Sequence, residues 1–365
     1  MGTFIKSKNN TNNIMKTVLY ALLPIILYSL YIHGYVLYDS GKINFIQIFY
    51  PILFILVGCL TSSVIELFYS LIFKKKDWKN YLKNSYSFFP GLFLALILPL
   101  ETPIYILIIG CVIASISKVI FGGFGKNMFN PAIVGYIFIM IIFASIFSNN
   151  LNSDLVTPLS NASSISGIGS YDELVKPYGS LMDLFIGNIP GSIASTSTFL
   201  CLLAFIFLTI TKTIKWRISV SYVASVFIVT YVIGRFLDQG VYYPLFHILS
   251  GGLIFTAVFM ATDPVTSCVT PIGQVFQGIF LGILTVIFRF IGFDGMFISI
   301  LIMNGFVTIF DKIGATARFN FIKTVIWFLV SCILIVIISI ALAAIKRNDS
   351  LDYEINEYCD NQIII

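Results

Sequence analysis

Long apolar runs separated by short polar segments make up most of this chain. Runs of a length that can cross about 30 Å of hydrocarbon occur at eleven places: 17–37, 46–70, 86–101, 104–121, 130–148, 196–211, 217–236, 243–262, 274–292, 295–312 and 322–345. The run 86–101 is short and contains Pro90 and Pro99, so we expect a broken helix there. The pattern predicts an all-α polytopic membrane protein with about ten to eleven transmembrane helices.

The composition agrees with a membrane protein and excludes several other classes. The chain has 365 residues, of which 58% are hydrophobic and 11% charged, whereas a soluble domain has about 25% charged residues. The six cysteines are scattered, with no C-x-x-C pair, so neither a metal site nor a Cys-ligated cluster is indicated. We find no Walker loop, HExxH motif or Ser/His/Asp arrangement, and therefore name no catalytic residue.

The distribution of charge predicts how the chain crosses the membrane. The net charge of +5 reflects lysines and arginines in short loops rather than a nucleic-acid partner. With eleven spans, every strongly basic loop, including Lys118 to Lys126, falls on the side of the N-terminus, which the positive-inside rule makes cytoplasmic. The acidic segment 149–195 then lies outside, as do the exceptions Arg235 and Arg289. We expect a multi-pass protein of the cell inner membrane.

Two parts of the sequence resemble each other weakly but in the same order. "FLALILPLETP", ending at Pro103, matches "FTAVFMATDPVTS" around Pro264, and "NMFNPAIVGYIF" later matches "LIMNGFVTIF". With five spans per unit, the two units would be inverted repeats with interrupted helices, an arrangement that builds a site at the membrane midplane. A chance match between apolar segments is the alternative.

These observations divide the chain into five parts. The parts are a cytoplasmic N-terminus (1–16), a first transmembrane repeat (17–148), an external loop (149–195), a second transmembrane repeat (196–315), and an extra span with an acidic tail (316–365).

The stretch "FGGFGKNMFNPAIVGY" contains loop-forming residues between two apolar runs. Gly122, Gly123 and Gly125 allow positive φ or a close approach to a ligand. Pro131 at a helix start leaves amides near Asn130 free to face an acceptor. The stretch is either a half-helix cradle for a flavin, quinone or ion, or an ordinary turn between two spans.

The stretch "MATDPVTSCVTP" carries an acidic residue at the end of an apolar run. Asp263 in that position is costly, which favours a functional role, although Asp-Pro also starts turns. We expect Asp263 and Asn304 to form a paired half-helix core with Gly122, Gly123, Gly125, Asn130 and Pro131.

Taken together, these segments resemble a known family. "FGGFGKNMFNPAIVGY", "GNIPGSIASTST", "WRISVSYV" and "TDPVTSCVTPIGQVFQGIFLGILTVIFRFIGF", in this order, resemble the RnfD subunit of the Rnf ion-translocating ferredoxin:NAD oxidoreductase complex. The related membrane subunit of the sodium-translocating NADH:quinone reductase is a more distant match. The resemblance covers residues 15 to 315 approximately.

The resemblance implies a flavoprotein with FMN joined through its phosphate to a threonine hydroxyl. The family motif is Ser-x-Ala-Thr followed by Pro-Leu, and the matching threonine is Thr157. The loop that contains it is predicted to lie outside, where the family's flavin-attaching enzyme acts. The residues before Thr157 are Asp154-Leu155-Val156, which departs from the motif. A second, noncovalently bound flavin is left open.

The resulting hypothesis is a membrane flavoprotein subunit of a redox-driven, ion-translocating electron transport complex. Its partners would be the other membrane and peripheral subunits, and it would not be an enzyme alone. A flavin-free channel or transporter on the same plan is one alternative. A degenerate scaffold subunit, suggested by the altered threonine motif, is the other.

Overall fold

The computed structural model describes residues 11–73, 78–123, 125–149, 158, 170–187, 191–317 and 321–363. Within these ranges the regular secondary structure is helical. The same ranges contain no β-strand, only an isolated β-bridge between Pro99 and Ser192. The prediction of an all-α protein is therefore confirmed for the described part.

The N-terminal part of the chain forms a series of helices, most of which are apolar. Its elements are α1 (Thr11–Leu30), η1 (Tyr31–Val36), α2 (Leu37–Asp39), η2 (Phe45–Phe49), α3 (Tyr50–Phe73), α4 (Trp78–Ser85), α5 (Phe89–Ile97), α6 (Ile104–Ile120), α7 (Pro131–Ile142) and α8 (Ala144–Asn149). The predicted run 86–101 is helical only over α5, which has 9 residues.

The rest of the chain begins with short elements and continues with long helices. Its elements are α10 (Tyr171–Leu174), η4 (Lys176–Tyr178), α11 (Leu181–Ile186), η5 (Ile193–Ser195), α12 (Thr198–Ile210), α13 (Trp216–Phe236), α14 (Tyr242–Leu249), α15 (Leu253–Phe255), η6 (Thr256–Met260), α16 (Pro271–Phe290), α17 (Met296–Ala317) and α18 (Phe321–Ile363).

Several of these helices are long and apolar enough to cross a membrane. The described residues contain 6 such helices, or 7 if Tyr242–Leu249 and Leu253–Met260, which meet at 61°, form one span. Three shorter apolar helices, α6, α7 and α12, fall below that length. The chain is thus a multi-pass membrane protein, but the predicted count of ten to eleven spans is not confirmed.

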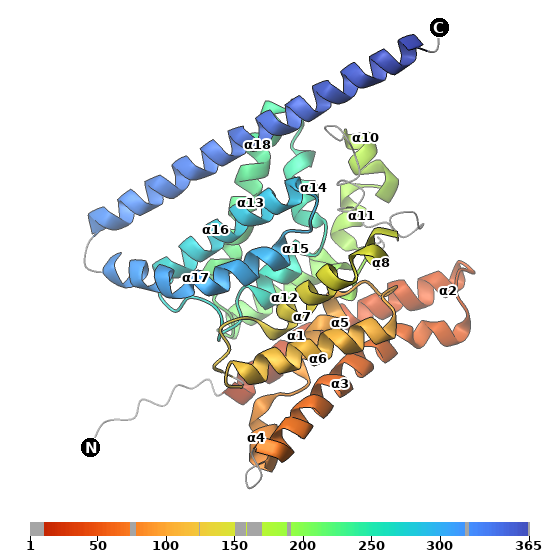
Figure 1. Cartoon of the computed structure of the whole chain (residues 1–365), viewed down its shortest axis with the longest axis vertical. Helices are drawn as coiled ribbons and strands as arrows, with labels where there is room; N and C mark the ends of the chain where they lie inside the picture. The colour runs from red at the N-terminus through yellow and green to blue at the C-terminus, as the bar shows by residue number, and fades with distance from the viewer. Residues whose placement is uncertain are drawn as a thin grey trace.

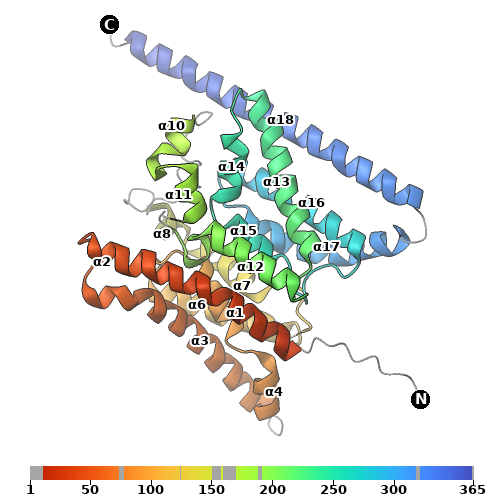
Figure 2. The same ribbon diagram turned by 180° about the vertical axis from the view of Figure 1, so that it is seen from behind.

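The helices pack in two similar series. In the first, α3 packs on α5 and α6, and α6 packs on α7. In the second, α13 packs on α14 and α16, and α16 packs on α17. The two series meet where α7 contacts α17, and outside both series α1 contacts α12 (Figures 1 and 2).

Close helix contact in the first series depends on glycine. The buried residues of α3 recur every three or four positions and are mostly small: Pro51, Phe54, Gly58, Ser62, Glu66 and Ser70. A Cβ on Gly91 of α5 would lie 2.0 Å from the carbonyl oxygen of Gly58. A larger residue at Gly91 would push the two helices apart, as expected for helices that pack through small residues in a membrane.

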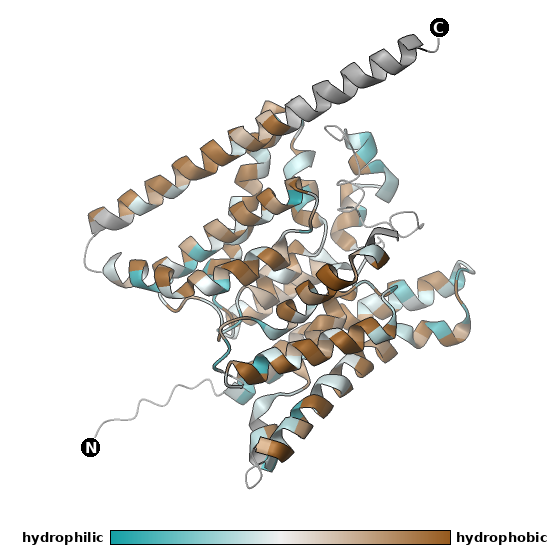
Figure 3. Ribbon diagram, viewed as in Figure 1, coloured by the Kyte–Doolittle hydropathy of each residue, from teal (hydrophilic) through white to brown (hydrophobic). Residues whose placement is uncertain are grey.

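Apolar residues cover most of the long helices, whereas the short helix α10 is mainly polar (Figure 3). Helix α18 lies against α13, α16 and α17, and its C-terminal end extends beyond the other helices (Figure 1). The predicted extra span 322–345 is part of this longer helix of 43 residues.

Candidate functional site: a cavity between two interrupted segments

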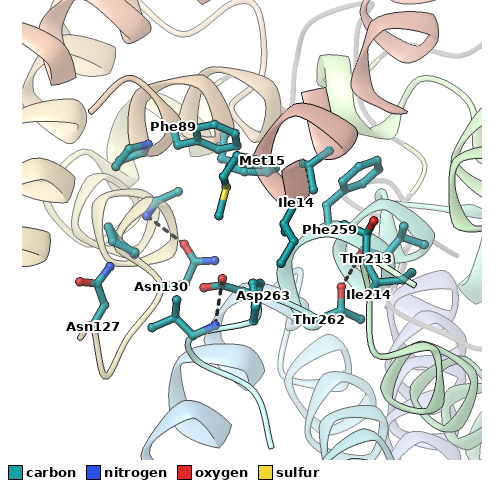
Figure 4. A pocket seen from close by; sticks show the side chains of 18 of the residues that line it. Ile14, Met15, Phe89, Asn127, Asn130, Thr213, Ile214, Phe259, Thr262 and Asp263 are labelled. Atoms are coloured by element: carbon teal, nitrogen blue, oxygen red, sulfur yellow. Dashed lines mark hydrogen bonds between the residues drawn. The ribbon is translucent and has the colours of Figure 1, made fainter. Parts of the chain in front are cut away.

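A cavity of about 90 Å³ lies where the two series of helices meet. Its walls come from the first turns of α1, from α5, from the start of α7, and from the segment between η6 and α16 (Figure 4). The apolar lining residues include Met15, Phe89 and Phe259. The polar ones include Asn127, Asn130, Thr213, Thr262 and Asp263. Two stretches that the sequence analysis selected separately therefore share one cavity.

Asn130 and Pro131 form the start of α7 on the cavity wall. The Asn130 side chain accepts a hydrogen bond from the amide of Ala132 at 3.1 Å, and Pro131 is the first helical residue. This is an ordinary N-cap, in which the side chain satisfies one of the free amides of the helix. Nearby, Oδ1 of Asn127 is buried without a hydrogen-bond partner in the described part of the chain. Asn127 therefore offers a free acceptor at the cavity.

Asp263 stabilises the turn between η6 and α16. Its carboxylate accepts from the amide of Val265 at 3.4 Å and from the hydroxyl of Thr266 at 3.1 Å. The hydroxyl of Ser267 donates to the Asp263 carbonyl at 2.6 Å. Figure 4 shows the Asp263 and Asn130 side chains next to each other at the cavity. Asp263 therefore both stabilises a turn and contributes a polar side chain to the cavity wall.

A lysine from the loop before α13 holds the same turn. The Lys215 ammonium donates to the hydroxyl of Ser267 at 2.8 Å and to its carbonyl at 3.0 Å. Burial lowers the pKa of Lys215, and the nearby Asp263 carboxylate opposes that effect. Burial likewise raises the pKa of Asp263, against the opposing effects of its hydrogen bonds and of Lys215. The two groups therefore favour each other's charged forms.

Asn304 links the start of α7 to the segment between η6 and α16. In the amide orientation that pairs both of its polar atoms, Asn304 accepts from the amide of Asn130 at 3.2 Å. It also donates to the carbonyl of Thr266 at 3.1 Å. The structure thus brings Asn130, Asp263 and Asn304 into one region. However, Asn304 lies inside the unbroken helix α17, whereas Asn130 lies at the start of a helix.

The three glycines lie on the turn that leads to this region rather than on the cavity wall. Gly122, Gly123 and Gly125 have φ values of 102°, 88° and 85°, a conformation that L side chains rarely adopt. The expected positive φ is confirmed. None of the three lines the cavity, so a direct ligand contact remains a prediction.

Sequence analysis missed a buried ion pair beside the cavity. Lys118 lines the cavity and pairs with Glu66 of α3, and the two side chains are only 1% and 0% exposed. The charge pattern assigns Lys118 to a basic loop, whereas the residue lies in the last turn of α6. Glu66 could have been found, because a single carboxylate within a transmembrane run is a functional hypothesis by default.

Thr157, the predicted flavin attachment residue, lies outside the described residues. The cavity is also small for a noncovalently bound flavin. At about 90 Å³ it is smaller than the roughly 150 Å³ cavity that accepts a single benzene ring. In this arrangement it fits a few water molecules or a small ion.

An all-helical, multi-pass membrane protein with a polar cavity between two interrupted segments belongs to the class of transport and membrane-complex proteins. The sequence profile of the NQR2, RnfD, RnfE family matches residues 1–320. The chain is a member of this family. Helix α18 begins directly after the matched residues.

Individual relatives agree with that membership. The chain is 32% identical over 277 residues to the subunit designated D of a proton-translocating ferredoxin:NAD(+) oxidoreductase complex from Clostridium ljungdahlii, covering 73% of this chain and 83% of the relative. It is 28% identical over 309 residues to the Na(+)-translocating counterpart from Acetobacterium woodii, covering 82% and 88%. It is 28% identical over 269 residues to the subunit designated B of a Na(+)-translocating NADH-quinone reductase from Pseudomonas paraeruginosa, covering 71% and 66%.

Proposed function

We propose that this chain is a membrane subunit of an ion-translocating ferredoxin:NAD oxidoreductase complex. The observation that carries the proposal is the match to the corresponding subunit of two such complexes over most of both chains. The other subunits of that complex would be its partners and would carry out the nicotinamide chemistry. We place the complex in the cell inner membrane, with the N-terminus of this chain cytoplasmic.

The same proposal includes inverted repeats of five spans each, 17–148 and 196–315. The two packing series support it, since α3 packs on α6 and α6 on α7 as α13 packs on α16 and α16 on α17. The cavity would then lie on the path of the transported ion, beside Asn130 and Asp263. Its size suits a small ion or water rather than a bulky solute.

We further propose that FMN is attached covalently to Thr157 by the flavin-attaching enzyme. Flavins exchange electrons one or two at a time, so the bound group would supply the redox chemistry. The support is the Thr157-Pro158-Leu159 sequence in the segment that charge distribution assigns to the outside. The altered residues Asp154 and Val156 favour the scaffold alternative instead.

In-gel flavin fluorescence of the denatured chain tests the covalent attachment. We expect a fluorescent band when the chain is produced in cells that make the attaching enzyme. A double variant, Asp154→Ser with Val156→Ala, restores the family motif and should fluoresce at least as strongly. Fluorescence only in the double variant would identify the natural chain as a scaffold. A dark band from both would favour a flavin-free channel or transporter.

A further inference from the structure

Two buried basic residues occupy similar places in the two packing series. Lys118 lies in the last turn of α6, and Arg289 lies in the last turn of α16. They are 1% and 6% exposed. A charged side chain inside a membrane protein is costly and needs polar partners. The partners of these two residues are of the same kind.

Lys118 binds the end of the helix that precedes α5. Its ammonium donates to the carbonyl of Ser85, the last residue of α4, at 2.7 Å. It also pairs with the carboxylate of Glu66. Immediately after Ser85 the chain bends at Tyr86, which has a φ of 48°, and α5 then begins. A carbonyl left free by the bend is thus satisfied by a cation.

Arg289 binds the end of the helix that precedes α15. Its guanidinium donates to the carbonyl of His247, in the last turn of α14, and to that of Ser250 at 3.5 Å. After Ser250 the chain bends at Gly251 and Gly252, each with a φ of 71°, and α15 then begins. In the described part of the chain, all the hydrogen bonds that Arg289 donates go to backbone carbonyls.

Three features are therefore common to both residues. Each lies in the last turn of a long helix, and each donates to carbonyls at the end of an earlier helix, α4 for Lys118 and α14 for Arg289. A left-handed bend follows those carbonyls in both cases. The sequence separation of Lys118 and Arg289 also falls between those of the pairs Pro99/Pro264 and Asn130/Asn304. We propose that Lys118 and Arg289 are equivalent positioning residues. Each fixes the segment after a bend, and each segment forms one wall of the cavity.

The physical reason is the burial of the residues before these bends, because Ser85 is 2% and Ser250 0% exposed. The last carbonyls of a helix have no partner within the helix, and a cation at this end stabilises them. Inside a membrane, unpaired backbone groups are costly, and irregular backbone needs protein partners. The segments so held supply Phe89, Pro90 and Phe93 on one wall, and Val258, Phe259 and Thr262 on the other.

The inference rests on the proposed equivalence of the two halves, but not on a bound flavin. The two positions differ in two respects. Lys118 forms an ion pair with Glu66 and itself lines the cavity, whereas Arg289 donates its hydrogen bonds to backbone carbonyls and does not line the cavity. We therefore expect the two residues to control different walls.

Cysteine labelling measures the two walls separately. Phe93→Cys reports the α5 wall and Phe259→Cys the η6 wall, each in a full-length chain without its native cysteines. The readout is the rate of reaction with N-ethylmaleimide. We expect Lys118→Met to raise the rate at position 93 by about tenfold, the factor implied by losing one charged hydrogen bond, and to leave position 259 within about twofold. Arg289→Met should do the reverse.

Exposed basic residues provide matched controls. Lys126→Met and Arg235→Met remove a cation near the ends of α6 and α13 from exposed positions and should change neither rate. Lys118→Arg and Arg289→Lys keep a cation at the same position, so they should change both rates less than the methionine variants do. These two variants remain informative if the methionine variants do not fold.

Equal changes at both walls in every variant would indicate general loosening and would overturn the proposal, as would unchanged rates in both methionine variants. A large change at both walls in Lys118→Arg or Arg289→Lys would also count against it. In-gel flavin fluorescence of the same variants separates this result from the proposed flavin attachment, because Thr157 lies in a different segment.

Discussion

The helices around the cavity and residues 170–187, part of the predicted external loop, are built in opposite ways. Around the cavity, long apolar helices are joined by buried polar contacts such as Glu66–Lys118. In residues 170–187, short helices such as α10 are held by local caps and by the exposed pair Lys176–Asp172, at 2.7 Å. The candidate ion site around the cavity is inferred from its geometry. The flavin hypothesis, by contrast, depends on a short sequence motif alone.

The sharpest test of this comparison is Thr157→Ala. We expect complete loss of covalent flavin fluorescence, because no other hydroxyl would accept the phosphate. Ser160→Ala, in the same segment, is the matched control and should keep full fluorescence. Both variants should retain the thermal stability of the parent chain, since each substitution only shortens a small side chain and adds no bulk or charge. Fluorescence that survives in Thr157→Ala would move the attachment elsewhere.

Glu66→Gln should have the largest effect on stability. It leaves Lys118 buried without its charged partner, and breaking a buried pair in this way costs about 3–5 kcal/mol. Thermal unfolding of the purified protein in detergent measures the loss. Glu101→Gln, at an exposed position between α5 and α6, should be close to neutral. Equal stability of Glu66→Gln and the parent chain would mean that the pair does not hold α3 to α6.

Asn304→Ala should have an intermediate effect. It removes the link between Asn130 and Thr266 and leaves two buried backbone groups unpaired, at a cost of about 1–3 kcal/mol. Thr316→Ala removes an exposed hydroxyl from the same helix and serves as the control. If the two variants unfolded at the same temperature, the amide orientation described for Asn304 would be wrong.

Asp172→Ala should have the smallest effect. The pair it forms with Lys176 is exposed, with side chains 67% and 61% accessible, and such pairs contribute about 0–1 kcal/mol. We expect no measurable change in thermal stability or in flavin fluorescence. Raising the salt concentration in the parent chain should likewise have no effect through this pair. A clear loss of stability would show that the Lys176–Asp172 pair contributes more to folding than its exposure suggests.

The apolar pattern predicted the helical class because runs of about 20 apolar residues are specific to membrane spans. Its count of ten to eleven spans is not confirmed, since α5 and α14 end at bends that hydropathy does not register. The Asn-Pro and Asp-Pro stretches could be selected because proline and glycine mark interrupted helices. Their shared cavity, and the contact from Asn304, could not be predicted, because they depend on how distant helices pack.

The two buried charges escaped prediction for a related reason. Charge counting treats every lysine or arginine near a helix end as a loop residue that faces water. Lys118 and Arg289 instead turn inward to carbonyls that only the three-dimensional bends leave free. Thr157 is the converse case, because its proposed role depends on a motif and not on packing.

Helix α18 has a consequence for how this chain could be assembled with neighbouring proteins. Its 43 residues span about 65 Å at 1.5 Å per residue, about twice the thickness of a hydrocarbon layer. Because it covers part of α13, α16 and α17, a neighbour on that side would meet α18 before it met those helices. In the part of the chain that the structure describes, the opposite side, formed by α1 and α3, has no such screen. The added helix therefore makes the two flanks of the molecule unequal, and limits the directions from which neighbours can approach.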